Sequence, residues 1–144
     1  MKLMFDTSVL GKVCHPRKHG DVRLWFRGLL GFRAHTVLIP EIADFELRRK
    51  LLQLGAVASL TVLDHLARDT TYVPLDTAMM RDAAALWARL RAQGRPTERD
   101  DALGVDVILA AQALRLGATV VTDNAKHLAQ MVDVRAWNDV PTQP

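Results

Sequence analysis

Short apolar runs alternate along the chain with longer segments of helical periodicity, and this alternation restricts the fold more than any other feature of the sequence. The runs predicted as strands are residues 2–5, 36–39, 72–75, 118–122 and 133–137. Pro74 favours an edge or end position for the third run, since proline cannot donate a hydrogen bond to a sheet. We therefore expect an α/β fold with a central, mostly parallel sheet of about four to five strands and helices on both faces.

The helical segments lie between these runs, and the chain has the size of one domain. Helices are expected at residues 22–30, 41–54, 56–68, 78–93, 105–116 and 125–131. Residues 11–20 contain Pro16 and predict a loop, and Asp21 is expected to cap the helix that follows. With 144 residues, of which 49% are hydrophobic, the chain can fill one core. We expect a single domain over residues 1–140 and a frayed tail at 141–144.

Composition excludes several classes of protein. Cys14 is the only cysteine, so the chain has no internal disulfide and no cysteine-based zinc cluster. No apolar run reaches the roughly 18 to 20 residues of a membrane span, and Asp6 interrupts the first run before a signal-peptide core can form. The five histidines have no paired ligand spacing, and no phosphate-binding glycine loop is present. A cytoplasmic protein without a membrane anchor is expected.

Two aspartates come at the ends of predicted strands. Asp6 follows the run 2–5, and Asp123 follows the run 118–122. Ligands of open parallel sheets bind outside the carboxyl ends of the strands, so we expect both carboxylates at the same edge of the sheet. Each aspartate also suits the cap of the helix that follows it, and strand position alone leaves both interpretations open.

Asp106 lies near the start of a helix that is almost entirely apolar. At about 100° per residue it faces inward with Leu109 and Ala110, whereas Gln112 and Arg115 are expected on the solvent-facing side. A carboxylate on a buried stripe is costly unless a cation or hydrogen-bond donors compensate its charge. A place in the first turn, where the helix dipole favours an acid, is the alternative interpretation.

Glu46 is the third candidate acid and lies in the helix predicted after the second strand. Arg49 and Lys50 follow it by three and four residues, so a surface ion pair is one interpretation of its position. Glu41 and Asp44 have the same ambiguity. Spacing alone does not select among these three acids.

Carboxylates that gather in one cleft need positive charge. Two like charges about 4 Å apart repel by roughly 4 kcal/mol at an effective dielectric constant near 20. A hard divalent cation removes this repulsion, because Mg²⁺ or Mn²⁺ prefers oxygen ligands and activates water for attack on a phosphodiester. The acids therefore indicate a metal site that acts on a nucleic acid.

The basic residues are concentrated near the N-terminus. The chain has 19 Lys and Arg against 16 Asp and Glu, a net charge of +3, yet Asp21 is the only acid between residues 12 and 33. The residues expected to pair with phosphates of RNA are Arg17, Lys18, Arg23 and Arg27. Simple solvation of these side chains on a loop and a short helix is the alternative.

Four short motifs occur in the order that is typical of PIN-domain ribonucleases. They are Asp6-Thr7-Ser8-Val9-Leu10, Glu46-Leu47, Asp106-Val107-Ile108-Leu109-Ala110-Ala111 and Val121-Thr122-Asp123-Asn124. The chain resembles this family from Lys2 to about Leu128, and it looks most like the VapC-type toxins of type II toxin–antitoxin pairs. Each motif alone has low specificity, but the four motifs together in this order are specific for the family.

The resemblance implies a Mg²⁺- or Mn²⁺-dependent endoribonuclease that acts as the toxin of such a pair and inhibits translation or growth. The catalytic and metal-binding acids that it implies are Asp6, Glu46, Asp106 and Asp123. The auxiliary residues that hold carboxylates or water are Thr7, Ser8, Thr122 and Asn124. The implied partners are RNA, a small cognate antitoxin and a second copy of the chain in a homodimer, with apolar faces supplied by the helix pair 42–66.

The sequence departs from the family pattern at two places. His127 and Leu128 stand where an acidic and an aromatic residue are usual, so an auxiliary acid is missing there. An aspartate and a phenylalanine precede Glu46 where small residues are usual, which leaves Glu41 as a rival for its role. An acidic site does not distinguish sugars, so a DNA-directed or structure-specific nuclease is the alternative enzyme. A degenerate nucleic-acid-binding regulatory module is the alternative without catalysis.

Overall fold

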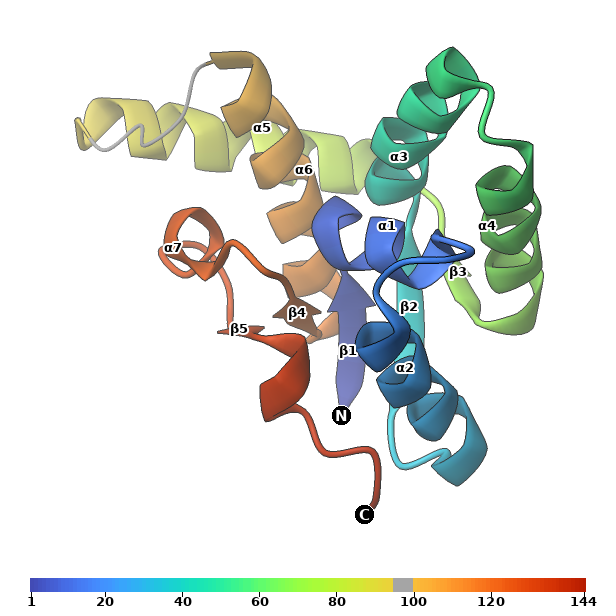
Figure 1. Ribbon diagram of the computed structural model, residues 1–144. Coiled ribbons are helices and arrows are strands. Elements are labelled where there is room, and N and C mark those ends of the chain that lie inside the picture. The colour runs from blue at the N-terminus through green and yellow to red at the C-terminus, as the bar shows by residue number, and fades with distance from the viewer. Residues whose placement is uncertain (95–99) are drawn as a thin grey trace.

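The computed structural model describes residues 1–94 and 100–144, which form one parallel sheet with helices on both sides (Figure 1). The strands are β1 (Lys2–Phe5), β2 (Thr36–Pro40), β3 (Thr71–Val73), β4 (Thr119–Val121) and β5 (Val134–Arg135). The helices are α1 (Thr7–Cys14), α2 (Gly20–Phe32), α3 (Glu41–Leu54), α4 (Val57–Asp69), α5 (Thr77–Ala92), α6 (Asp100–Leu116) and α7 (Ala125–Leu128). A 3-10 helix at Trp137–Asp139 follows β5. The predicted α/β class and strand number are confirmed.

Strand β1 lies at the centre of the sheet. The strand order is β3-β2-β1-β4-β5, and every neighbouring pair is parallel. Leu3 pairs with Val37 of β2 on one side and with Thr119 of β4 on the other. The chain therefore builds outward from β1 to β3 and then returns to the opposite side of β1. Ligands of open parallel sheets bind at this kind of switch point, outside the carboxyl ends of β1 and β4.

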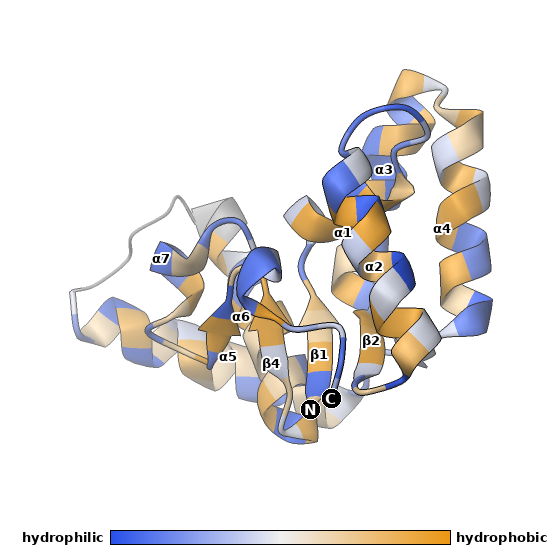
Figure 2. Cartoon of the chain, turned by 60° about the horizontal axis from the view of Figure 1, so that its bottom comes forward, coloured by the Kyte–Doolittle hydropathy of each residue, from blue (hydrophilic) through white to orange (hydrophobic). Residues whose placement is uncertain are grey.

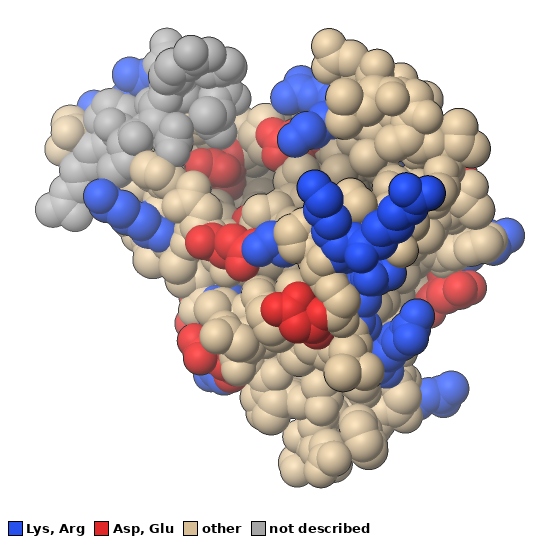
Figure 3. Space-filling view, in the orientation of Figure 1, with Lys and Arg blue, Asp and Glu red and all other residues tan. Residues whose placement is uncertain are grey.

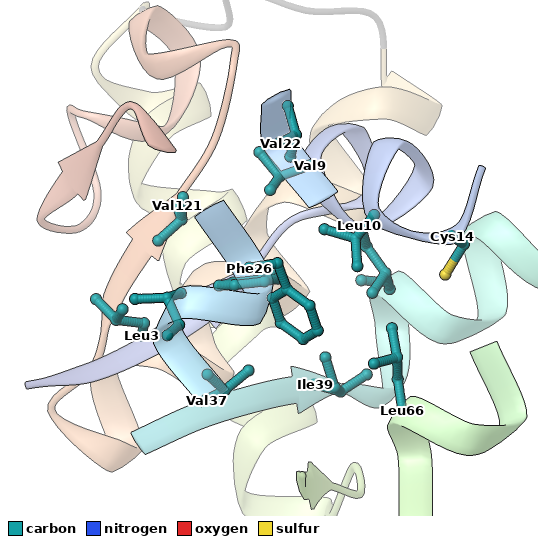
Figure 4. Packing of buried hydrophobic residues seen from close by; sticks show 14 of the residues in the cluster. Leu3, Val9, Leu10, Cys14, Val22, Phe26, Val37, Ile39, Leu66 and Val121 are labelled. Carbon is teal, nitrogen blue, oxygen red and sulfur yellow. The ribbon is translucent and has the colours of Figure 1, made fainter. Parts of the chain in front are cut away.

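Alternate side chains of the central strands fill two separate cores. Leu3 and Phe5 of β1 pack with residues of α1, α2, α3 and α4, whereas Met4 packs with residues of α5 and α6. Figure 4 shows the first core from close by, with Phe26 of α2 against the sheet. The inner strands are mostly apolar and the helices carry polar and apolar faces (Figure 2). Within the described part of the chain, no helix is long and apolar enough to cross a membrane.

The first connection is a helix where residues 11–20 predicted a loop. Asp6 caps α1, because its carboxylate accepts the Val9 N–H at 3.0 Å. The helix continues to Cys14 since one of its faces buries apolar side chains against the sheet. The connection to α2 is thereby reduced to residues 15–19. The cap and the buried face outweigh Gly11, whereas Pro16 lies in the connection that remains.

Asp21 does not cap α2, which corrects another expectation. The helix begins after His19, whose backbone is left-handed with a φ of 59°. Asp21 lies inside the first turn, where its carboxylate accepts the N–H of the adjacent Val22 at 2.9 Å. An acid at this position still favours the helix through the positive end of its dipole.

Gln112 is buried, although helical spacing predicted that it faces solvent. Its Nε2 donates to the Val73 carbonyl at 2.8 Å, and its Oε1 accepts the Ile42 N–H at 3.5 Å. Ile42 lies in the first turn of α3, whose cap residue is Pro40 and offers no side-chain acceptor. Gln112 thus supplies, from α6, hydrogen bonds that the start of α3 and the end of β3 would otherwise lack.

The end of the chain packs against α2. Trp25 Nε1 donates to the Val140 carbonyl at 2.9 Å, and His35 Nε2 lies 2.9 Å from the Pro141 carbonyl. Trp25 also stacks on Phe5 of the central strand. The residues after the 3-10 helix are therefore linked to the core through Trp25.

Replacing Gln112 with leucine is expected to lower the free energy of unfolding by about 1–3 kcal/mol, because it leaves a buried carbonyl and a buried N–H without partners. Urea unfolding followed by circular dichroism measures the change. The matched control is Gln53→Leu, the same substitution at an exposed position of α3, for which a change within about 0.5 kcal/mol is expected. Equal stability of the two variants would contradict the capping role of Gln112.

Candidate active site

A small cavity opens at the carboxyl end of β1, where the strand order reverses. Its volume is about 180 Å³. The described residues that line it are Asp6, Thr7, Ser8, Glu46, Val105, Asp106, Leu109 and Asn124. Three of these side chains are carboxylates, and they come from the end of β1, from α3 and from α6. The structure therefore brings together three of the four predicted acids, and we call this space the acidic cavity.

Asp6 is the buried member of the acidic cavity. Ser8 Oγ donates to its Oδ1 at 2.6 Å, the Val9 N–H donates to the same oxygen, and Thr122 Oγ1 donates to its Oδ2. Burial raises the pKa of Asp6 above its usual value; the hydrogen bonds from Ser8, Thr122 and Val9 oppose this shift, and the nearby charge of Asp123 adds to it. A bound cation would favour the ionised form that burial disfavours.

Glu46 projects from α3 into the acidic cavity, whereas Glu41 does not line it. Arg49 Nη2 lies 3.9 Å from the Glu46 carboxylate, which is a long contact between partly exposed groups and leaves the carboxylate oxygens accessible. Asp44 faces the other way: it is buried, with its carboxylate bound to Arg48 at 2.9 Å and to the Tyr72 hydroxyl at 2.7 Å. Of the three rival acids of α3, Glu46 is thus the one that meets Asp6.

Asp106 reaches the acidic cavity from α6, beside Val105 and Leu109. The prediction that it shares the inward face with Leu109 agrees with this placement. Leu109 is buried at 4% exposure, whereas Asp106 is partly exposed. Asp106 therefore lies beside apolar side chains at the wall of the acidic cavity.

Asp123 lies next to the acidic cavity without lining it. Its Oδ2 is 2.6 Å from Lys12 Nζ, and its N–H donates to Ser8 Oγ at 3.3 Å. Thr122 Oγ1, which donates to Asp6, also accepts the Asn124 N–H at 2.9 Å. Hydroxyl groups therefore join the turn after β4 to Asp6, while the Asp123 carboxylate pairs with a lysine.

Sequence reasoning included Lys12 in the basic stretch but missed its contact with an acid of the site. Ser8 and Lys12 are four residues apart in α1 and so lie on one face of that helix. Because Asp6 caps this helix, the face that carries Ser8 is adjacent to the strand-end acids. This spacing is the signal in the sequence that could have identified Lys12.

The four basic residues predicted to bind phosphates lie on the connection between α1 and α2 and on α2 itself. Arg17 and Lys18 are exposed, and their backbone N–H groups donate to His15 Nδ1. Arg23 is half-buried, and its Nη1 donates to the Pro16 carbonyl at 2.9 Å, which ties the connection to α2. Figure 3 shows basic side chains gathered over this region, on the same face as acidic side chains in the hollow beside α3.

The donor set of the acidic cavity suits a hard divalent cation. Carboxylate, hydroxyl and amide oxygens line it, and Mg²⁺ and Mn²⁺ prefer such ligands. Among the described residues, no three acids, histidines or cysteines stand as close together as the ligands of a formed metal site. Cys14 offers no alternative, because it is buried and its pKa is raised to about 12, so its thiol stays protonated.

The chain is similar to known proteins in sequence pattern and in fold. The family model of the PIN domain matches residues 3–132. Similar solved structures are VapBC2 from Rickettsia felis bound to a promoter DNA fragment, DNA-bound VapBC from Salmonella typhimurium, and FitAcB from Neisseria gonorrhoeae. Their TM-scores are 0.76, 0.75 and 0.72, and their sequence identities are 18%, 21% and 19%. The alignments cover 95%, 95% and 96% of this chain and 99%, 98% and 99% of theirs. No curated protein sequence matches the chain.

PIN domains are nucleases, and PIN nucleases generally use divalent metal ions. The family match extends from the first strand to beyond the turn that carries Asp123, so it includes every element that contributes to the acidic cavity. The fold, the family match and the position of the strand-end acids all point to the same family. This chain belongs to the PIN-domain family.

Proposed function

We propose that the protein is a metal-dependent endoribonuclease and the toxin of a toxin–antitoxin pair. The observation that carries the proposal is the acidic cavity, in which Asp6, Glu46 and Asp106 come together from elements far apart in the sequence. The PIN fold supports nuclease activity, and the structural neighbours are VapBC and FitAB complexes. The choice of RNA over DNA rests on the resemblance to VapC-type toxins.

The residues of the site have distinct proposed roles. Asp6, Glu46 and Asp106 hold Mg²⁺ or Mn²⁺ in the acidic cavity, and Asp123 is the fourth ligand at its border. Ser8 and Thr122 position Asp6 by donating hydrogen bonds to its two oxygens. Thr7 and Asn124 line the cavity and orient water or a ligand carboxylate there. When bound, the cation neutralises the carboxylates and activates water for attack on phosphorus.

Asp6→Asn and Asp106→Asn test the proposal. Each substitution removes one negative charge from the acidic cavity with little change of shape, so cleavage of labelled RNA is expected to fall by about 100-fold or more. Asp6→Asn is expected to keep the fold, because the amide oxygen still caps α1. Cleavage is also expected to stop in EDTA and to return with Mg²⁺ or Mn²⁺. The matched control is Asp139→Asn, which changes an exposed acid outside the cavity.

The same assay separates the alternative functions. Cleavage of labelled DNA in preference to RNA would show that the protein is a DNA-directed nuclease and not a ribonuclease. Binding of RNA without cleavage under any metal condition would indicate a regulatory module. Full activity of both variants, or unchanged cleavage in EDTA, would contradict the acidic cavity as the active site.

The basic residues near the N-terminus are proposed to hold the RNA backbone. An RNA strand that approaches the carboxylates meets repulsion unless positive charge compensates it. Arg17, Lys18 and Arg27 are exposed and lie on the connection and helix that follow α1, which begins at Asp6. Phosphate contacts position the backbone and carry little base information. Arg23 contributes its charge from a fixed place, since it is bound to the Pro16 carbonyl.

Changing Arg17, Lys18 and Arg27 together to glutamine is expected to weaken binding of all RNA sequences alike. Three lost phosphate contacts would flatten the slope of log affinity against log salt by about 2. Fluorescence anisotropy over a series of salt concentrations measures this slope, and Mn²⁺ affinity is expected to stay unchanged. The control is Arg68→Gln, Arg81→Gln and Arg89→Gln together, which removes equal charge from exposed positions of α4 and α5. An unchanged slope in the first variant would mean that these side chains are simply solvated and do not contact phosphates.

The proposed partners are a small antitoxin and a second copy of the chain. A groove of about 270 Å³ lies between α1, α2 and α4, with an apolar floor that includes Phe26, Val62 and Leu66. His15, Arg23 and Arg27 add polar and basic groups at the same groove. An antitoxin segment with apolar and acidic side chains fits this lining. For the homodimer, exposed apolar side chains of the α3–α4 hairpin supply the surface, and these are Phe45, Leu52, Leu54 and Val57.

Purification of the protein from its native host is expected to yield a stable complex with a small protein, and co-expression of that small protein is expected to restore growth of cells that the protein alone inhibits. Val62→Glu, which places a charge at a partly exposed position of the groove, is expected to weaken this complex. Leu54→Glu is expected to lower the mass of the free protein to that of a monomer in multi-angle light scattering. Harmless overexpression together with the lack of any small partner would contradict the toxin assignment.

A further inference from the structure

Lys12 and Asp123 form a short ion pair at the border of the acidic cavity. Lys12 Nζ lies 2.6 Å from Asp123 Oδ2, and the two side chains are 32% and 29% exposed. Both side chains are thus mostly shielded from water, and an ion pair is stronger there than on an open surface. Lys12 is held on the last turn of α1, and Asp123 is held by the turn after β4.

The direction of the Asp123 carboxylate contrasts with that of its backbone. Its N–H is bound to Ser8 Oγ, and Ser8 also donates to Asp6, so the backbone of Asp123 is anchored to the acidic cavity. The neighbouring residues Thr122 and Asn124 contact Asp6 or line the cavity. Of these groups, the Asp123 side chain is the one that contacts a positively charged side chain, that of Lys12.

We propose that Lys12 is a positioning residue that competes with the divalent ion for Asp123, so that binding of the ion must displace the Lys12 ammonium group. The inference rests on the proposed function, since it takes the acidic cavity as the metal site. The ammonium group of Lys12 pairs with Oδ2 of Asp123, and a divalent ion bound to the same carboxylate repels that ammonium group. The affinity for the ion is therefore lowered by the free energy needed to break the Lys12–Asp123 pair.

Three consequences follow for Mn²⁺ binding without RNA. Lys12→Met keeps the length of the side chain and removes its charge, so the affinity for Mn²⁺ is expected to rise by about fivefold, the upper range for a partly exposed ion pair. Lys12→Arg keeps the charge and is expected to bind Mn²⁺ as the unchanged protein does. Asp123→Asn is expected to weaken binding about fivefold more in the Lys12→Met background than in the unchanged protein.

Isothermal titration calorimetry and the electron paramagnetic resonance signal of free Mn²⁺ measure these affinities. The matched control is Lys126→Met, which removes the same charge from exposed α7, three residues after Asp123. Lys126 forms no ion pair with the residues that the structure describes, so its loss reports only the general effect of charge. An equal rise in affinity for both lysine variants would overturn the competition.

The outcomes also separate this inference from the proposed function. If Asp106→Asn loses Mn²⁺ binding while Lys12→Met binds as the unchanged protein does, the metal site stands and the competition is wrong. If Asp106→Asn binds Mn²⁺ with full affinity, the ion does not occupy the acidic cavity and the proposed function fails. A thermal melt of each variant checks that the fold is kept. Additive effects of Lys12→Met and Asp123→Asn would likewise exclude the competition.

Discussion

The hydrogen bonds to the Asp6 carboxylate hold together the elements on which the site depends. One oxygen accepts the Val9 N–H and the Ser8 hydroxyl of α1, and the other accepts the Thr122 hydroxyl from the end of β4. The N–H of Asp6 donates to the Val121 carbonyl at 3.2 Å, which continues the pairing of the central strands. A single aspartate thus ends a strand, starts a helix and fixes a turn more than 100 residues away in the sequence.

The Asp6 carboxylate serves both the fold and the acidic cavity, because it caps α1 and also lines the cavity. Burial disfavours the ionised form of Asp6 and raises its pKa, and the hydrogen bonds only partly offset this effect. Glu46 and Asp106 line the same cavity, so three acids share a small volume. Lys12 neutralises the fourth acid, Asp123, from the side. Carboxylates therefore dominate the acidic cavity, and a cation bound there would relieve both their mutual repulsion and the desolvation of Asp6.

Much of the fold could be predicted from the sequence, because its strongest signals are local. The run 2–5 and the run 118–122 are apolar since both faces of the sheet are covered, and Pro74 correctly indicated the end of an edge strand. Gly55 ends α3 in a left-handed conformation with a φ of 63°, as the break in helical spacing suggested. The first helix was missed because its stability comes from packing on the sheet.

The site was harder to predict, because its contacts join distant parts of the chain. The direction of Asp106 followed from helical spacing, but the finding that Glu46 rather than Glu41 lines the acidic cavity needed the position of α3 relative to β1. Gln112 shows the limit of periodicity: a polar residue on an expected solvent face is buried, where it bonds the end of β3 and the start of α3, whose cap residue Pro40 has no side-chain acceptor. The pairing of Lys12 with Asp123 depends on the turn after β4.

Anomalous diffraction from crystals of the protein soaked in Mn²⁺ tests the central claim most directly, because it locates the ion without relying on activity. The account predicts a Mn²⁺ peak inside the acidic cavity, bound by carboxylate oxygens of Asp6, Glu46 and Asp106. It also predicts that Asp106→Asn crystals lose this peak under the same soak. A peak at another place on the molecule, or a cavity that stays without Mn²⁺ at saturating concentration, would contradict the account.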